Sequence, residues 1–261
     1  MTVTAPGATQ TTSASARALA RTLARTLAGG AVCGALAGFL VGGVLGRLAM
    51  RLLAATSPAY AQGQITDDRA VVGDITLGGT IGLALFVTVL GAVGGLIYLW
   101  VRRVLPPSRR ARVLGFGLFT GTVGGALFVH DHPSFDYTVL TPTWLAVLLF
   151  IALPLLFGLA VAGLVETVDR PAGLLRRTPV WSVVAAGLLV IALALPLVTP
   201  FLVAAFVIAL VPALRELWGS HAVTVAGSAL LVAMVLWGAY GLVVDVVSVA
   251  TDVPATAPLN P

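Results

Sequence analysis

The chain has 261 residues, of which 59% are hydrophobic and only 10% are charged, and its mean hydropathy is +1.04. These values exclude an ordinary soluble domain, in which about a quarter of the residues are charged. The net charge of +5 and the pI near 10.3 would suggest nucleic-acid binding in a soluble protein, but here the charges lie in short loops between apolar stretches. We therefore expect a membrane protein that contacts anionic lipid head groups and no nucleic acid.

Seven stretches are predicted to span a membrane, since a transmembrane helix needs about 20 mostly apolar residues. In chain order they cover roughly residues 28–50, 77–101, 113–130, 143–165, 180–198, 200–214 and 222–247. The fifth and sixth form a predicted hairpin, because a single helix over 180–214 would be about 50 Å long, too long for one crossing. The predicted fold class is all-α: a polytopic bundle of about seven transmembrane helices.

Three regions follow from this division. Residues 1–26 are expected to be a disordered to amphipathic cytoplasmic segment, 27–250 a single transmembrane domain, and 251–261 a short extracytoplasmic tail. Arginines at every fourth position from Arg17 to Arg25 place three charges on one helical face. That face either lies on the inner leaflet or simply continues the first helix.

The cationic side chains predict how the chain is oriented, and all fifteen of them are arginines. Twelve lie before the first span or in alternate gaps after it, whereas the opposite gaps hold only Arg47, Arg51 and Arg69. Loops rich in Lys or Arg stay in the cytoplasm. The N-terminus is therefore predicted inside and, after seven spans, the C-terminus outside, in the cytoplasmic membrane of a bacterium.

Glycines recur at every fourth position in the first three spans, and we predict that they pack helices together. The longest row is in the first span and a shorter one in the third: Gly30, Gly34, Gly38, Gly42, Gly46, Gly117, Gly121 and Gly125. Residues four apart share a helix face, so these rows form smooth grooves for the close van der Waals contact that holds helices together in lipid. This is glycine-zipper packing, against a helix of the same chain or of a second copy.

Prolines take the place of glycines in the later spans. Pro154 lies within the fourth span and Pro212 near the end of the sixth. Each removes a backbone hydrogen bond and favours a kink. Broken helices mark binding sites in transporters, but a purely structural kink is the simpler interpretation.

A search for chemistry finds no catalytic motif. No span carries a charge near its centre, which disfavours a proton- or ion-coupled carrier. The sequence contains no H-E-x-x-H zinc motif, no G-x-S-x-G nucleophile turn, no P-loop and no G-x-G-x-x-G. We therefore predict no cofactor and no catalytic residue, and an enzyme is disfavoured.

A polar cluster is predicted at the outer surface. Its members are Arg47, Arg51, Asp67, Asp68, Asp74 and Asp245. In the first interpretation these are interfacial charges that pair across the bundle, with Asp245 of the last span tied to Arg47 or Arg51. In the second, the two arginines, one helical turn apart, clamp a phosphate or a carboxylate.

A third interpretation of this surface is a metal site. His130 and His132 lie on the same side of an extended segment, with Asp136 close behind in the sequence. Imidazole together with carboxylate suits Zn, Ni or Co. A single H-x-H in a loop is nevertheless a weak pattern.

Several segments resemble multi-pass integral membrane proteins of high-GC bacteria that have no known activity. They are GRLAMRLL at 46–53, TDD at 66–68 and GDITLGGT at 73–80, with HDHP at 130–133 and WLA at 144–146. The resemblance covers most of residues 30–165. It implies a membrane location and carries no mechanism.

Three functions stay open. A structural or accessory subunit of a membrane complex is favoured by the glycine grooves and by the uncharged spans. A permease component for a small solute or metal ion would use the outer His and Asp residues. An enzyme acting on a lipid-linked phosphate at the outer leaflet would use Arg47 and Arg51. The expected partners are the lipid bilayer and other membrane subunits or a second copy of the chain.

Overall fold

The computed structural model describes residues 8–65, 71–73, 76–129, 140–169 and 211–252, together with isolated residues between 185 and 208. In this part of the chain the regular elements are helices, and a lone β-bridge joins Ile65 to Val71. The all-α prediction is therefore confirmed. Five helices are long and apolar enough to cross a membrane: Arg21–Thr56, Leu77–Val101, Arg109–Phe128, Thr143–Val168 and His221–Val249.

The first span is one continuous helix in three parts. It consists of α1 (Ala8–Ala37), the π-helix η1 (Gly38–Leu45) and α2 (Gly46–Thr56). The helix begins at Ala8, inside the segment expected to start disordered, so the arginine repeat belongs to a continuation of the first helix. Alanine and arginine are among the strongest helix formers, and they dominate this stretch.

The next helices begin at side-chain caps. Thr76 precedes α3 (Leu77–Val101), and its hydroxyl accepts a hydrogen bond from the backbone N–H three residues later. Ser108 does the same for α4 (Arg109–Phe119). Such caps satisfy backbone donors that a helix N-terminus leaves unpaired, and they set the first residue of each span.

The remaining helices complete the bundle. They are the π-helix η3 (Thr120–Gly124), α5 (Gly125–Phe128), α7 (Thr143–Val168), α11 (Pro212–Gly219) and α12 (His221–Asp252), with the short 3-10 turn η2 (Ala59–Ala61) after α2. Four of the seven predicted spans thus agree with described helices to within a few residues at most ends, and the first is longer than predicted. The fifth span, 180–198, lies outside the described residues except for isolated positions.

The two prolines behave differently. Pro154 lies inside α7, which continues through it. Pro212 was predicted near the end of the sixth span, 200–214, and this is wrong, because Pro212 opens α11 after Val211, whose backbone is extended. Proline lacks an N–H and is favoured in the first helical turn, and it drives the preceding residue out of the helical region.

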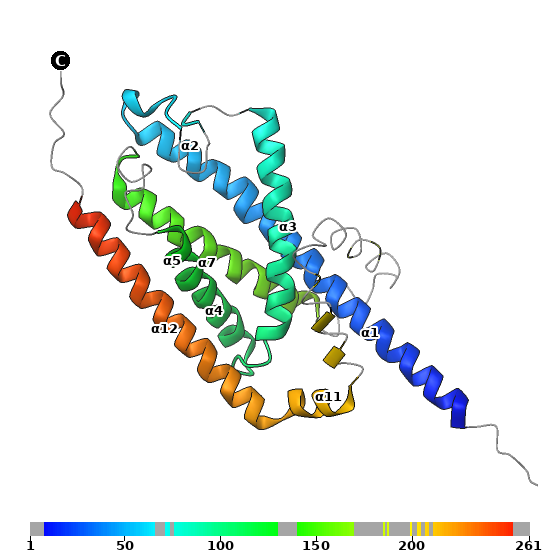
Figure 1. The fold of residues 1–261 in the computed structure, drawn as a ribbon. Helices are drawn as coiled ribbons and strands as arrows, with labels where there is room; N and C mark the ends of the chain where they lie inside the picture. The colour runs from blue at the N-terminus through cyan, green and yellow to red at the C-terminus, as the bar shows by residue number, and fades with distance from the viewer. Residues whose placement is uncertain are drawn as a thin grey trace, which may run out of the picture.

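Figure 1 shows the arrangement of the bundle. The long first helix runs through the middle, and α3 crosses it with extensive contact to α1 and η1. On another side α1 packs on α7, which in turn carries α4, η3 and α5. Helix α12 lies at the edge and contacts mainly η3 and α5.

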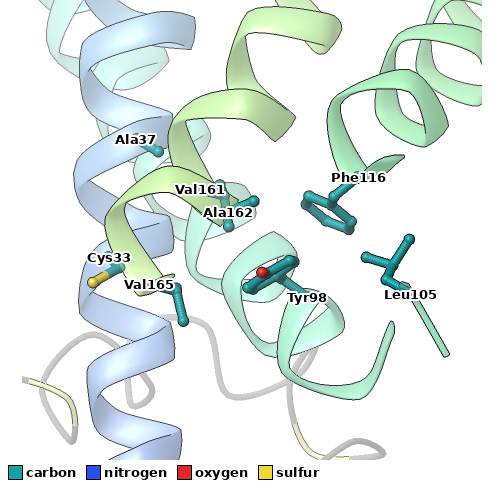
Figure 2. Packing of buried hydrophobic residues seen from close by; sticks show 8 residues of the cluster. All are labelled: Cys33, Ala37, Tyr98, Leu105, Phe116, Val161, Ala162 and Val165. Carbon is teal, nitrogen blue, oxygen red and sulfur yellow. The ribbon is translucent and has the colours of Figure 1, made fainter. Parts of the chain in front are cut away.

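The largest core cluster joins four helices (Figure 2). Tyr98 of α3 and Phe116 of α4 are fully buried, and their rings meet edge to face with centroids 4.9 Å apart. Val161 and Ala162 of α7 lie toward the two rings, and Cys33 of α1 lies at the other side of the cluster, near Val165. An aromatic pair in this geometry contributes roughly 0.5–1.5 kcal/mol beyond its buried area, so this contact helps to hold α3 against α4.

The backbones of α1 and α3 touch through glycines on both helices. A Cβ added to Gly34 would lie 2.7 Å from the backbone N of Gly95, and one added to Gly38 would lie 2.9 Å from the Cα of Gly91. Real Cβ atoms do not approach backbone atoms so closely, so these positions tolerate no side chain at the present helix separation. The glycine groove of the first span therefore faces a helix of the same chain.

The glycine row does not stay in this contact along its whole length. Gly30 faces the Leu99 side chain, and Gly42 faces the Val87 side chain. Gly46 meets only the carbonyl oxygen of Val41, in its own helix, at 3.8 Å. The two helices cross at Gly34 and Gly38 and separate beyond Gly42, so Gly46 lies outside the contact. In the third span, by contrast, leucine side chains of α7 pack against Gly117 and Gly121, and Gly125 faces Ile151 and Leu242.

The helices have two distinct ends. At one, called here the Asp169 end, the C-termini of α3 and α7 meet the start of α4, and Ser228 near the start of α12 donates a hydrogen bond to the Val104 carbonyl at 2.7 Å. At the other, the Ser57 end, the hydroxyl of Ser57 after α2 accepts a hydrogen bond from the Thr141 N–H before α7 at 3.1 Å. Successive spans therefore run in alternate directions.

Candidate functional site

The Asp169 end holds a network around one carboxylate. Glu166 of α7 accepts a hydrogen bond from the hydroxyl of Tyr98 at 2.8 Å and contacts Nη1 of Arg112 at 3.4 Å through both carboxylate oxygens. Its side chain is only 12% exposed, and that of Arg112 is 28% exposed. Buried charges need such partners. The three residues belong to α3, α4 and α7, so the network ties these helices together.

Two further contacts surround this network. Arg102, just after α3, forms an ion pair with Asp169 at 3.0 Å. Arg109 at the start of α4 donates to the hydroxyl of Thr167 at 2.6 Å. Both lie nearer to solvent, since the Asp169 side chain is 53% exposed, and exposed ion pairs contribute little to stability.

A cavity of about 330 Å³ opens beside these pairs, between α1, α3 and α7. Its polar rim includes Thr22, Arg25 and Arg102 together with Asp169, and its floor is formed by apolar atoms such as those of Leu99. One guanidinium nitrogen of Arg25, Nη2, is buried without a hydrogen-bond partner. The rim thus carries two cations and one carboxylate, a nearly balanced set.

A second cavity lies toward the Ser57 end and has a different character. It measures about 270 Å³ and lies between the first helix and α3. Apolar side chains form most of its wall, and Arg47 and Arg51, one turn apart, line its outer part. The other lining residues are Phe39, Gly43, Val44, Leu48, Thr80 and Ala84. No acidic residue is among these described lining residues.

Arg47 is held between the two helices of this cavity. Its Nη2 lies 3.5 Å from where a Cβ on Gly79 would be, so the guanidinium lies against the first turn of α3. Its Nε is buried and has no hydrogen-bond partner. Arg51 is exposed. The structure therefore brings together the two arginines that the sequence singled out and adds apolar walls that the sequence did not predict.

The other residues predicted for the outer surface are not placed beside these arginines. Asp67, Asp68 and Asp74, and likewise His130, His132 and Asp136, lie outside the described residues, so the metal site stays a prediction. In the described part of the chain, no three His, Cys, Asp or Glu side chains gather to hold a metal. Asp245 is half-buried on α12 and interacts with other groups, but no ion pair joins it to Arg47 or Arg51.

Sequence reasoning missed the network at the Asp169 end. Glu166 and Asp169 follow the predicted fourth span, 143–165, and Tyr98 lies within the predicted second span, so no pattern in the sequence pairs them. The available signal was a carboxylate at the last turn of a span whose neighbours carry arginines. Its partners could be named only once α3, α4 and α7 were known to be adjacent.

Comparison with known proteins gives no relative from which a role could be taken. No family model, no curated protein and no solved structure matches this chain. The described helices, by length and composition, indicate a membrane protein. Anything more specific is inferred from the geometry of the chain itself.

Proposed function

We propose that this protein is a structural or accessory subunit of a membrane complex, which binds a partner transmembrane helix along the outward face of α12. The observation that carries the proposal is the exposure of Trp237 and Tyr240, 79% and 70%, on one face of that helix. Residues three apart are neighbours on a helix surface. Only 6% of the apolar window of α12 is buried inside the protein.

The depth of these two side chains makes their exposure informative. Trp237 follows Ser228, whose hydroxyl donates to the Val104 carbonyl at the Asp169 end, by nine residues, or about 14 Å along the axis, close to the middle of a bilayer whose core is about 30 Å thick. Tryptophan and tyrosine favour the membrane interfaces, because their N–H and O–H groups need hydrogen-bond partners. At mid-membrane depth a partner helix can satisfy these groups, whereas lipid tails cannot.

The interior of the bundle supports a structural role. The backbones of α1 and α3 touch at Gly34 and Gly95, so no passage runs between these two helices at that level. The polar network at the Asp169 end satisfies Glu166 with Tyr98 and Arg112. Glycine-zipper packing of α1 on α3 is part of the proposal, since small residues allow the close approach that stabilises helices in lipid.

A photo-crosslinking amino acid placed at Trp237 tests the proposal in native membranes. We expect an adduct of defined protein mass, and the added mass separates a second copy of this 26.6 kDa chain from a different subunit. The matched control places the same amino acid at Leu85, an exposed residue of α3, where only lipid should be crosslinked. Lipid adducts alone at both positions would overturn the proposal.

We further propose the bacterial cytoplasmic membrane as the location, with seven spans, the N-terminus inside and the C-terminus outside. The arginine distribution supports this orientation through the tendency of cationic loops to stay in the cytoplasm. Arg102, Arg109 and Arg112 all lie at the Asp169 end, which supports the proposal that this end faces the cytoplasm.

A second candidate, recognition of a lipid-linked phosphate, is favoured by the cavity that contains Arg47 and Arg51. No described residue beside that cavity supplies a nucleophile or a general base with an activating partner. The second candidate is therefore the binding of a lipid-linked phosphate, without catalysis. The permease alternative depends on His130, His132 and Asp136, which lie outside the described residues.

A further inference from the structure

We propose that the cavity between α2 and α3 is a binding site for one anionic phospholipid, with its phosphate between Arg47 and Arg51 and the start of one acyl chain along the apolar wall below. The site is formed by two helices that cross through their glycines and then separate. Figure 1 shows α2 and α3 diverging from this crossing toward the Ser57 end. The cavity lies where they part.

The depth of the arginines is that of lipid phosphates. Arg25 and Arg47 are 22 residues apart on the continuous first helix, a rise of about 33 Å. This matches the roughly 30 Å hydrocarbon core of a bilayer, so the two side chains lie at its opposite edges. On α3, Thr80 is likewise 22 residues before Arg102, which places both walls of the cavity at the same level.

The charge of the cavity requires an anion. Arg47 lies against the first turn of α3, where unpaired backbone N–H groups carry partial positive charge, and Arg51 adds a second guanidinium one turn away. A cation beside the positive end of a helix is unfavourable unless an anion lies between them. The buried Nε of Arg47 has no hydrogen-bond partner among the described residues, and guanidinium groups bind phosphate oxygens in a bidentate way.

The apolar wall selects a lipid over a free anion. Phe39, Val44 and Leu48 line the cavity and are 44%, 45% and 54% exposed. Leu48 lies between the two arginines, and Val44 and Phe39 lie about one and two turns deeper than Arg47 toward the hydrocarbon region, as an acyl chain does from its head group. The volume of about 270 Å³ lies just below the roughly 300–1,000 Å³ of pockets that enclose a whole drug-sized ligand. It fits a phosphate and the first methylenes, with the rest of the lipid in the bilayer.

Native mass spectrometry of the full chain in dodecyl maltoside tests the site, with phosphatidylglycerol titrated as the probe. We expect Arg47→Gln and Arg51→Gln each to weaken phosphatidylglycerol binding about tenfold. Arg110→Gln is the matched control, because Arg110 is exposed on α4 at the other end of the bundle. That variant should bind as the wild type does, and circular dichroism should show all three variants equally folded.

A second pair of variants tests the apolar wall without changing charge. Ala84→Leu fills the cavity and should weaken phosphatidylglycerol binding about tenfold. Leu85→Phe, at the neighbouring exposed position, should leave it unchanged. If the variant at position 84 binds as the wild type does, the acyl chain does not lie along this wall and the proposal is overturned.

Further probes separate the sources of the anion. Millimolar inorganic phosphate that displaces the lipid as effectively as unlabelled phosphatidylglycerol would show a free-anion site and overturn the lipid assignment. Equal binding of uncharged diacylglycerol would show an apolar groove only. Asp67, Asp68 and Asp74 are the internal competitors. If the wild type binds no phosphatidylglycerol but a variant with all three aspartates replaced by Asn does bind it, the arginines pair with these loop carboxylates. That result would overturn the proposal.

Discussion

Gly34 is one of the residues at which the contact between α1 and α3 leaves no room for a side chain. A methyl group there would lie 2.7 Å from the backbone N of Gly95, and backbone atoms cannot move aside as a flexible side chain can. We expect Gly34→Ala to lower the free energy of unfolding by about 1–3 kcal/mol, as overpacking does. The measurement is thermal unfolding in detergent followed by tryptophan fluorescence.

The matched control is a glycine of α3 that touches nothing. A Cβ added to Gly82 has no heavy atom within 4 Å, and alanine is up to about 1 kcal/mol better than glycine within a helix. Gly82→Ala should therefore keep or raise the melting temperature. Equal losses at both positions would mean that backbone contact does not hold α1 on α3.

Glu166 is the centre of the polar network that connects α3, α4 and α7. We expect Glu166→Gln to cost about 1.5–3 kcal/mol, the range for hydrogen bonds to charged groups, because it removes the charge that faces Arg112 at 3.4 Å. Tyr98→Phe should cost about 1 kcal/mol, since only its 2.8 Å hydrogen bond is lost. Chemical or thermal unfolding in detergent measures both losses.

Asp169→Asn provides the comparison for this network. The Asp169 side chain is 53% exposed in its ion pair with Arg102, and exposed pairs contribute at most about 1 kcal/mol.

In a double-mutant cycle, Arg112→Gln should recover part of the loss caused by Glu166→Gln. Additive losses would show that the two residues do not interact in the membrane protein.

The extent to which the sequence predicted these residues depends on the kind of contact. Gly34 was predicted to pack because spacing along one helix is visible in the sequence. Its partner Gly95 was not, because the sequence does not tell which helix crosses which. Glu166 was missed for the same reason, since its partners Tyr98 and Arg112 are distant in the chain.

At the scale of elements, a glycine of α12 lets this helix approach the backbone of η3 closely. A Cβ added to Gly238 would lie 3.1 Å from the backbone of Thr122 and Val123 in η3. We expect Gly238→Leu to push α12 away from the bundle, because the neighbouring atoms are backbone. The change is measured as faster proteolysis at the ends of α12 and as a lower melting temperature.

Gly241, one turn further along α12, supplies the control for that prediction. It has no heavy atom within 4 Å of an added Cβ, so Gly241→Leu should leave proteolysis of α12 unchanged. The same result for both variants would show that the contact with η3 does not dock this helix.

Element boundaries were predictable where local chemistry sets them. The start of α3 at Leu77 follows from Thr76, whose hydroxyl caps the helix, and the second and fourth spans begin where predicted. The π-helices η1 and η3 were not predicted, because both lie in glycine-rich runs whose four-residue spacing suits an ordinary α-helix. Tertiary packing selects the wider turn, and Gly46 lies outside the predicted groove because the two helices separate beyond Gly42.

At the scale of the whole molecule, the ends of the helices restrict how the chain crosses the membrane. Helix α7 ends, and α12 begins, at the same Asp169 end. We therefore expect the segment between them to cross the membrane an even number of times. The first helix begins at that end as well, with Arg25 beside Asp169 in one cavity, whereas α12 finishes at the other end. The described ends of the helices therefore predict an odd total number of spans.

This arrangement predicts that reporters after Pro107 and after Asp252 lie on opposite sides of the membrane. The arginines around α4 assign the first reporter to the cytoplasm, so alkaline phosphatase should be active only when fused after Asp252. Green fluorescent protein should fluoresce only when fused after Pro107. Activity of the same reporter at both sites would contradict the odd count.

Labelling at one position between the predicted fifth and sixth helices distinguishes a protein with five spans from one with seven. Residues 180–211, which precede α11, are apolar and would supply two short crossings, with Pro196 and Pro200 flanking the turn. In a Cys33→Ala background, Thr199→Cys should therefore react with an impermeant maleimide added outside intact cells. A cysteine in place of Ser108, at the cytoplasmic start of α4, should react only after the membrane is opened. If the cysteine at position 199 behaves like the one at 108, the segment does not cross, and the protein has five spans.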